Sequence, residues 1–210
     1  MGKNEIRDKT SRATKWSSIT EIMSKLVTPV SSTILARLLT PEAFGVVATV
    51  NMITSFAEVF TDAGFQKYIV QHDFKDKKQL DDNTTVAFWS NIVIALLIFT
   101  IICIFSDELA EMVGNPGLGS VVIVASLSLI INSFSSIQMA RFKRDFDFKT
   151  LFYIRIVTCL IPLVVTVPIA FATHSYWALI IGTLVSNVAN AVILTIKSSW
   201  KPRFYYSFQQ

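Results

Sequence analysis

Residues 17–71 read SSITEIMSKLVTPVSSTILARLLTPEAFGVVATVNMITSFAEVFTDAGFQKYIVQ, and this stretch decides the fold. Apolar residues predominate on both sides of the corner Leu39-Thr40-Pro41-Glu42, over about 20 positions each, the length with which an α-helix crosses a bilayer. The stretch therefore predicts two membrane-spanning helices, 16–38 and 41–65. Thr40 is expected to cap the second helix, and Pro41 suits its first turn, where a missing N–H costs nothing.

Both predicted helices carry polar side chains that recur at steps of three and four residues. In the first helix these side chains are Ser17, Glu21, Ser24, Thr28 and Ser31. In the second helix they are Asn51, Ser55, Glu58 and Asp62. Residues at this spacing share one helix face. Because charge exposed to lipid is costly, each polar face is expected to line the interior of the bundle or a water-filled cavity.

Four further apolar segments predict spans at 84–105, 117–140, 150–172 and 176–196, and they are expected to form walls around the first two helices. The sequence thus predicts an all-α, polytopic integral membrane protein with six transmembrane helices. Residues 1–198 are assigned to the transmembrane domain, and residues 199–210 are expected to begin a linker. Prolines inside spans, at positions 29, 162 and 168, are tolerated in membranes and often mark bends.

Charge patterning predicts the orientation in the membrane. Only 16% of the residues are charged and 52% are hydrophobic, against about 25% charged in soluble domains. Most Lys and Arg residues fall in the N-terminal arm, in the loops after the second and fourth spans, and in the tail. Basic residues mark cytoplasmic loops, so both termini are predicted to be cytoplasmic. The same distribution, in short loops between apolar spans, argues against a nucleic-acid partner.

No catalytic constellation is recognisable, and neither an enzyme nor a metal or cofactor site is predicted. His72 and His174 fall in loops on opposite sides of the membrane, and Cys103 and Cys159 lie singly within apolar runs. No nucleotide-binding or zinc-protease motif is present. Energy for any transport would have to come from ion coupling or from the membrane potential.

Three cationic residues lie within or at the ends of spans, namely Lys25, Arg37 and Arg155. An anionic head group entering from the cytoplasm could meet Lys25 and Arg155, so these two residues are candidates for substrate binding. Arg37, at the outer end of the first helix, is included as a third candidate. Alternatives are open for two of them. Arg155 could extend to the interface as a snorkelling side chain, and Arg37 could anchor the outer end of the first helix.

Three acidic residues, Glu21, Glu58 and Asp62, are candidates for ion coupling or for ion pairs. Glu58 is predicted to lie at a membrane depth similar to that of Lys25. An isolated ammonium group inside the bilayer is costly, so Lys25 is expected to pair with Glu58 or with Glu21. Glu58 and Asp62 could equally stabilise the fold or take up a proton.

The segments ILARLLTPEAFG (34–45), FTDAGF (60–65) and IVQ (69–71) resemble the N-terminal region of the polysaccharide transporter family. QMARFKRDF (138–146) resembles that family's loop after the fourth helix. These proteins are oligosaccharide flippases of the multidrug/oligosaccharidyl-lipid/polysaccharide exporter superfamily. The resemblance implies a MATE-like transporter with two lobes around a central cavity that opens alternately to each side. The chain matches one lobe, and it is expected to be a fragment or to need a C-terminal lobe or a second subunit.

The resemblance implies a flippase for polyprenyl-diphosphate-linked oligosaccharide in the bacterial cytoplasmic membrane, serving lipopolysaccharide, capsule or exopolysaccharide synthesis. The expected partners are this lipid-linked sugar and the lipid bilayer. Three alternatives are open: a multidrug exporter of the same superfamily, a membrane enzyme of polysaccharide assembly, and a non-transporting scaffold or degenerate fragment. The enzyme alternative would need a substantial outer loop, whereas the predicted outer loops are short.

Overall fold

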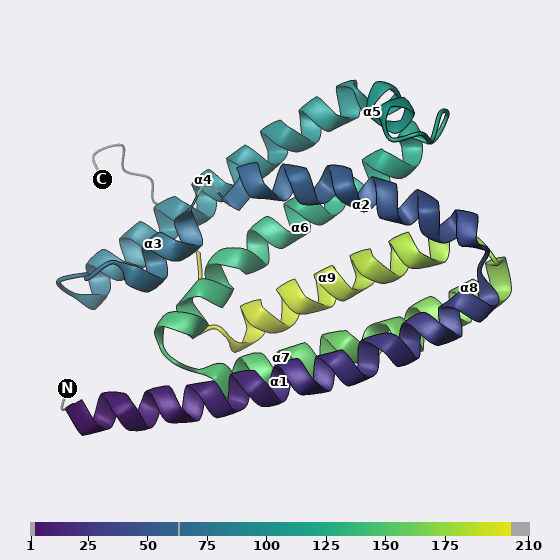
Figure 1. Cartoon of the computed structure of the whole chain (residues 1–210). Helices are drawn as coiled ribbons and strands as arrows, with labels where there is room; N and C mark the ends of the chain where they lie inside the picture. Colours follow the sequence, from purple (N-terminus) through teal and green to yellow (C-terminus); the bar gives the residue numbers. More distant parts are fainter. Residues whose placement is uncertain (1–2, 63, 203–210) are drawn as a thin grey trace.

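The structure is a computed structural model that describes residues 3–62 and 64–202, with side chains from residue 14 onward. All regular structure in this part of the chain is helical (Figure 1), which confirms the all-α class. The elements are α1 (Lys3–Leu38), α2 (Pro41–Asp62), α3 (Phe65–Gln71), α4 (Lys77–Ile104), α5 (Ser106–Met112), α6 (Gly119–Arg144), α7 (Phe148–Ile161), the π-helix η1 (Pro162–Thr166), α8 (Val167–Thr173) and α9 (Trp177–Lys197).

Five helical segments among the described residues are long and apolar enough to cross a membrane. They are Pro41–Asp62, Lys77–Ile104, Gly119–Arg144, Phe148–Thr173 and Trp177–Lys197. The helix α1 is long, at 36 residues, but it does not meet this criterion, because polar and charged side chains interrupt its apolar surface. Five of the six predicted spans are therefore supported by length and composition. The remaining one, the first predicted span at residues 16–38, stays a prediction.

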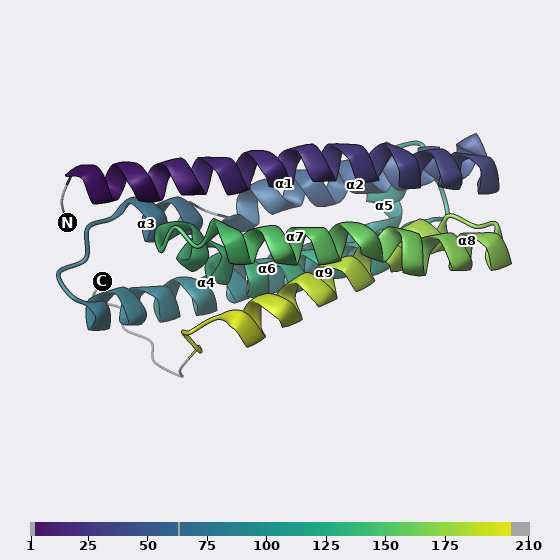
Figure 2. The ribbon, with the colours of Figure 1, turned by 90° about the horizontal axis from the view of Figure 1, so that it is seen from below.

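The helix at the centre of the bundle differs from the expected arrangement, in which the first two helices would form the centre. The helix α1 packs along α7, and α2 packs on α6. The two helices meet at their corner and then diverge to opposite sides of the bundle (Figures 1 and 2). The centre is instead α6, half of whose most apolar window is buried, against 22% for α2. Apolar composition alone does not distinguish a central helix from a peripheral one, because lipid and protein are equally apolar neighbours.

The corner between α1 and α2 is held by the contacts that its sequence predicts and by one that it does not. The hydroxyl oxygen of Thr40 accepts a hydrogen bond from the backbone N–H of Ala43 at 3.3 Å, which confirms the predicted cap. From the turn after α8, His174 Nδ1 forms a hydrogen bond with the backbone oxygen of Leu38 at 3.0 Å. The buried side chains of Leu39, Ala43 and neighbouring residues of α8 and α9 complete this end of the bundle.

Several helix boundaries differ from the predicted ones. The first turn of α4 begins at Lys77 and is capped by Asp76, which accepts a hydrogen bond from the N–H of Gln79 at 2.7 Å. The expected outer loop 106–117 contains the short helix α5. Pro29 lies within the continuous helix α1, whereas Pro162 begins the π-helix η1. Neither proline can donate the backbone hydrogen bond of an α-helix, but of the two only Pro162 coincides with a change to π-helical hydrogen bonding.

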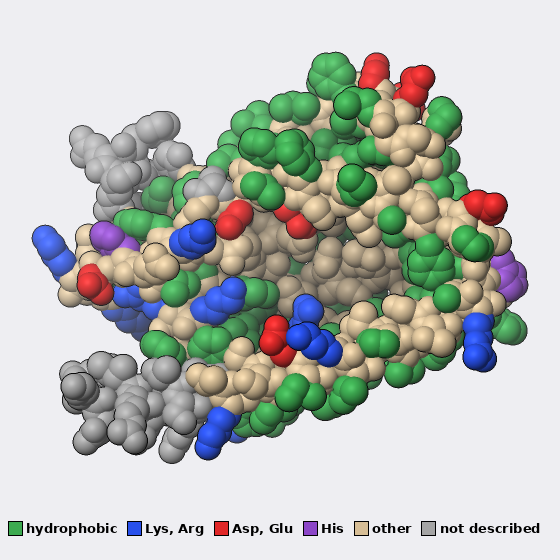
Figure 3. Space-filling view, viewed as in Figure 1, with side chains coloured by type: hydrophobic (Ala, Val, Ile, Leu, Met, Phe, Trp, Pro, Cys, Tyr) green, Lys and Arg blue, Asp and Glu red, His purple; other side chains and the backbone are tan. Residues whose placement is uncertain are grey.

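The connections between helices fall at two ends of the bundle. The start of α1, the α3–α4 and α6–α7 connections and the end of α9 lie at one end (Figure 1). The α1–α2 corner, α5 and the α8–α9 turn lie at the other. The basic loops are thus grouped together as the charge pattern predicts, and Lys and Arg side chains gather toward that end in Figure 3. That this end faces the cytoplasm stays a prediction.

Candidate functional site

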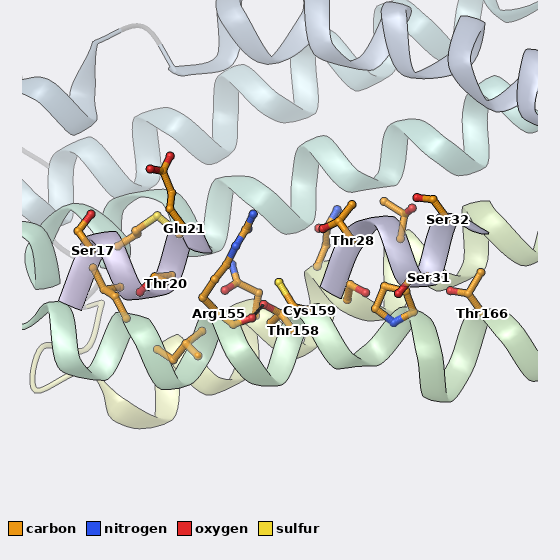
Figure 4. Close-up of a pocket in the computed structure, with 18 of the residues that line it drawn as sticks. Ser17, Thr20, Glu21, Thr28, Ser31, Ser32, Arg155, Thr158, Cys159 and Thr166 are labelled. Atoms are coloured by element: carbon orange, nitrogen blue, oxygen red, sulfur yellow. Dashed lines mark hydrogen bonds between the residues drawn. The ribbon is translucent and has the colours of Figure 1, made fainter. Parts of the chain in front are cut away.

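A cavity of about 630 Å³, lined by both polar and apolar side chains, lies between α1, α7, η1 and α9 and is called the first cavity. Apart from Leu35, its α1 wall consists of hydroxyl side chains and one carboxylate, from Ser17, Thr20, Glu21, Thr28, Ser31 and Ser32. The hollow is visible in Figure 3, and Figure 4 shows these side chains along it. Four of the five residues of the predicted polar face line this cavity, which confirms that the face is turned into the bundle.

The opposite wall of the first cavity combines a cation with further hydroxyl and amide groups. Arg155, Thr158, Cys159 and Thr166 come from α7 and η1, and Thr183, Ser186, Asn187 and Asn190 come from α9. Lys143, near the end of α6, is the second basic residue in the lining. Because α6 ends among the basic loops, this charge lies toward that end of the bundle.

Arg155 is joined to α1 through Ser24, the fifth residue of the predicted polar face. Its Nε donates a hydrogen bond to Ser24 Oγ at 3.4 Å, and that hydroxyl also lies 3.4 Å from Cys159 Sγ. In Figure 4 the guanidinium extends from α7 between the Ser17 end and the Ser31 end of the cavity. A guanidinium carries five N–H donors, and in the described chain only the Nε donor is used, so the others are available to an anionic ligand.

A second cavity, of about 430 Å³, lies between α2, α4 and α6. Ser55, Glu58 and Asp62 of the second predicted polar face line it, which confirms the expectation for these three residues, whereas Asn51 is exposed and does not. Asn132 of α6 donates a hydrogen bond from Nδ2 to Glu58 Oε1 at 2.8 Å. The two cavities share Met139 and Asn190 in their linings, so they adjoin each other at α6 and α9.

The candidate site residues are divided among the first cavity, the second cavity and the exposed surface outside both. Glu21 and Arg155 line the first cavity, and Glu58 and Asp62 line the second. The exposed residues Lys25 and Arg37 line neither cavity.

The structure does not bring Lys25 and Glu58 together, although both are borne on helices that meet at one corner. Among the described side chains, Lys25 forms no ion pair with Glu58 or Glu21; the ion pair seen there joins Arg141 to Asp81. The divergence of α1 and α2 is the reason, because it places the two polar faces in different cavities. Equal depth along two helices therefore did not imply contact.

Sequence reasoning missed three polar residues of α6 that connect it to neighbouring helices. Gln138 Nε2 donates to Thr195 Oγ1 of α9 at 3.0 Å. Arg141, whose side chain is 7% exposed, forms a 2.7 Å ion pair with Asp81 of α4. Arg144 donates to the backbone oxygen of Ile69 in the last turn of α3, at 2.8 Å, and to that of His72 just after this helix, at 2.7 Å.

The signal for these contacts was the spacing of three residues between Gln138, Arg141 and Arg144, which places them near one another on a helix. The sequence predicts Arg141 and Arg144 in the loop after the fourth span. They lie instead in the last turns of α6, where a basic side chain also interacts favourably with the helix C-terminus.

Five apolar helices, with polar side chains turned into open cavities between them, define a multi-pass membrane protein. The chain belongs to the polysaccharide biosynthesis protein family, whose model matches residues 34–210, and this confirms the resemblance to the polysaccharide transporters.

Three relatives match most of this chain. The lipopolysaccharide biosynthesis protein WzxC of Escherichia coli is 22% identical over 201 residues, covering 96% of this chain and 39% of the relative. The succinoglycan biosynthesis transport protein ExoT of Rhizobium meliloti is 25% identical over 84% of this chain and 35% of its own length. A membrane protein of the cps region of Klebsiella pneumoniae is 26% identical over 94% of this chain and 39% of its own length. The chain thus spans less than two-fifths of these relatives, and no solved structure matches it.

Proposed function

We propose that this chain is the N-terminal lobe of a flippase that moves lipid-linked oligosaccharide across the bacterial inner membrane. The observation that carries the proposal is the first cavity, in which Arg155 faces a wall of hydroxyl side chains. Membership of the polysaccharide biosynthesis family supports the proposal. So does the similarity to ExoT, which is a succinoglycan biosynthesis transport protein. A carrier of this kind transports its substrate and carries out no chemical step on it.

The chemistry of the first cavity suits a sugar diphosphate. Ser, Thr and Asn side chains can donate and accept hydrogen bonds and therefore match sugar hydroxyls. A guanidinium binds phosphate through paired N–H donors, which an ammonium group cannot imitate. At about 630 Å³ the cavity falls within the range of about 300–1,000 Å³ typical of small-molecule sites, so it would hold part of the head group while the lipid tail stays in the bilayer.

The proposed orientation places both termini in the cytoplasm. It requires α1 to cross the membrane in addition to the five apolar segments. An anionic head group arriving from the basic end would then meet Lys143 and, beyond the carboxylate of Glu21, the guanidinium of Arg155. The polar face of α1 is compatible with a span because it is turned toward α7 and the cavity. Lys25 and Arg37 are proposed as secondary substrate contacts outside the cavity, and Glu21, Glu58 and Asp62 as candidates for ion coupling.

A binding experiment tests the proposal. The 210-residue chain in nanodiscs is titrated with polyprenyl-diphosphate-linked oligosaccharide, with polyprenyl monophosphate, and with a hydrophobic organic cation. We expect the diphosphate-linked sugar to bind most tightly. Preference for the organic cation would instead support a multidrug exporter, and binding of none of the three would contradict a substrate site in this lobe.

A second experiment tests whether the chain acts alone. The relatives are more than twice as long, and a two-lobed cavity needs walls from both lobes. We therefore expect residues 1–210 to fail to complement a flippase-deficient strain and to succeed when co-expressed with a matching C-terminal lobe. Complementation by a monomer of this chain would refute the two-lobe proposal.

A further inference from the structure

Two buried oxygen atoms in the second cavity have no hydrogen-bond partner. They are Oδ1 of Asp62, at the end of α2, and Oδ1 of Asn91, on α4. Asn91 is only 2% exposed. Its Nδ2 is already committed, because it donates to Ser136 Oγ at 2.7 Å and to the backbone oxygen of Ser133 at 3.3 Å. The amide is therefore fixed with its oxygen as the unpaired end, and a buried acceptor without a donor is costly.

Several of the surrounding side chains offer further acceptors, although the lining also contains the hydroxyl of Ser55 and the amides of Gln66 and Asn190. Four hydroxyl groups in the lining donate their hydrogens to backbone oxygens of their own helices, so only lone pairs are left to face a ligand; they belong to Thr61, Ser133, Ser135 and Ser136. The amide of Asn132 donates to Glu58. No Lys or Arg side chain is among the described residues that line this cavity.

We propose that the second cavity binds a monovalent cation, Na⁺, between the carboxylate of Asp62 and the amide oxygen of Asn91. Carboxylate and amide oxygens are the ligands that hard cations prefer. The lining holds two carboxylates, but only Asp62 has an unpaired buried oxygen, whereas Glu58 accepts a hydrogen bond from the amide of Asn132. The site is therefore proposed for a single monovalent ion that pairs with Asp62. A Na⁺ ion would satisfy both oxygens without leaving excess positive charge among these spans.

The position of the site suggests a role for the ion, and this role rests on the proposed function. Asn190 and Met139 line both cavities, so an ion bound beside Asp62 would adjoin the cavity that holds Arg155. Helices α2, α4 and α6, which supply the ion site, also pack on one another. Binding of Na⁺ would therefore stabilise one arrangement of these helices and bias the shape of the neighbouring substrate cavity.

Thermal unfolding of the 210-residue chain in nanodiscs tests the ion site. The midpoint Tm is measured in NaCl and in choline chloride at equal ionic strength and fixed pH. A ligand that binds only the folded state raises Tm as its concentration rises, so we expect Na⁺ to raise Tm and choline not to. The Na⁺-dependent shift should be lost in Asp62→Asn and in Asn91→Ala and kept in the matched control Glu42→Gln, a carboxylate on the same helix outside both cavities.

Broadening of the ²³Na NMR signal provides a second readout, which does not depend on a change in stability. It should appear with the parent chain and with Glu42→Gln and disappear with Asp62→Asn, a variant of unchanged shape. Equal shifts in Tm with NaCl and choline chloride, or a Na⁺ signal retained in Asp62→Asn, would overturn the proposal. Stabilisation by acid alone, without any effect of Na⁺, would overturn it in favour of a proton. Binding of lipid-linked sugar is measured separately in choline buffer, so a failure of the proposed function is distinguishable from a failure of the ion site.

Discussion

Arg155 of α7 donates a hydrogen bond from Nε to the hydroxyl of Ser24 on α1, over 3.4 Å, and so links the two walls of the first cavity. The residues are 131 positions apart in the sequence. Because Ser24 belongs to the polar face of α1, this contact turns that face toward the guanidinium. The Arg155 side chain is exposed within this open cavity, and extension to the interface as a snorkelling side chain stays the alternative interpretation.

Arg155→Ala should weaken binding of polyprenyl diphosphate to the chain in nanodiscs by about 10- to 100-fold, because a hydrogen bond to a charged group contributes about 1.5–3 kcal/mol. Arg155→Lys should keep the charge and lose the paired geometry, giving an intermediate affinity. Lys25→Ala, at a proposed secondary contact outside the cavity, should lose less affinity than Arg155→Ala. Lys67→Ala is the matched control, because Lys67 is exposed and lines neither cavity, and it should change the affinity little. An equal loss in Lys25→Ala and Arg155→Ala would restore Lys25 as a primary binding residue.

Gly182→Ala should destabilise the protein. A Cβ atom at this position of α9 would overlap the hydroxyl of Thr166, a residue of η1 that is 3% exposed. Overpacking of this kind costs about 1–3 kcal/mol, which should appear as a lower Tm in detergent. Gly45→Ala on α2 is the control, because nothing lies within 4 Å of its added Cβ, and it should not lower Tm. If both variants unfold at the parent temperature, η1 does not pack against α9 as described.

Arg141→Ala should cost about 1.5–3 kcal/mol, the range for a hydrogen bond to a charged group. The guanidinium joins Asp81 at 2.7 Å and Thr84 at 3.3 Å, and its removal would disconnect α6 from the first turns of α4. A double-mutant cycle with Asp81→Asn, measured by denaturant unfolding, should show that the two effects are not additive. Lys143→Ala is the control, because Lys143 is exposed and lies two residues along the same helix, and it should change the free energy of unfolding little. Additive effects of Arg141→Ala and Asp81→Asn would rule out the coupling.

Cysteine labelling tests the orientation. In a background without Cys103 and Cys159, single cysteines at Glu111 and Ser175 should react with a membrane-impermeant maleimide added outside intact cells. Cysteines at Lys77 and Lys143 should react only after permeabilisation. The first pair lies at the end of the bundle with α5 and the α8–α9 turn, and the second pair at the basic end. The reverse pattern would contradict cytoplasmic termini.

The sequence by itself determined the helices, their polar faces and the grouping of the basic loops. These properties are local, because 3.6 residues per turn is set by the backbone and places residues three and four apart on one face. Most residues of the faces predicted from Ser17 to Ser31 and from Asn51 to Asp62 accordingly line cavities, and Asn51 does not. The family also followed from short segments, because their residues are read directly in the sequence.

Only the tertiary structure decided which elements face one another. The separation of Lys25 from Glu58, the contact between Arg155 and Ser24, and the ion pair of Arg141 with Asp81 all depend on how distant helices pack. Apolar surfaces of similar composition can pack in many pairings, and lipid competes with each of them. The pairing is settled by the summed fit of many side chains, such as Gly182 against Thr166, and no periodicity within one helix carries that information.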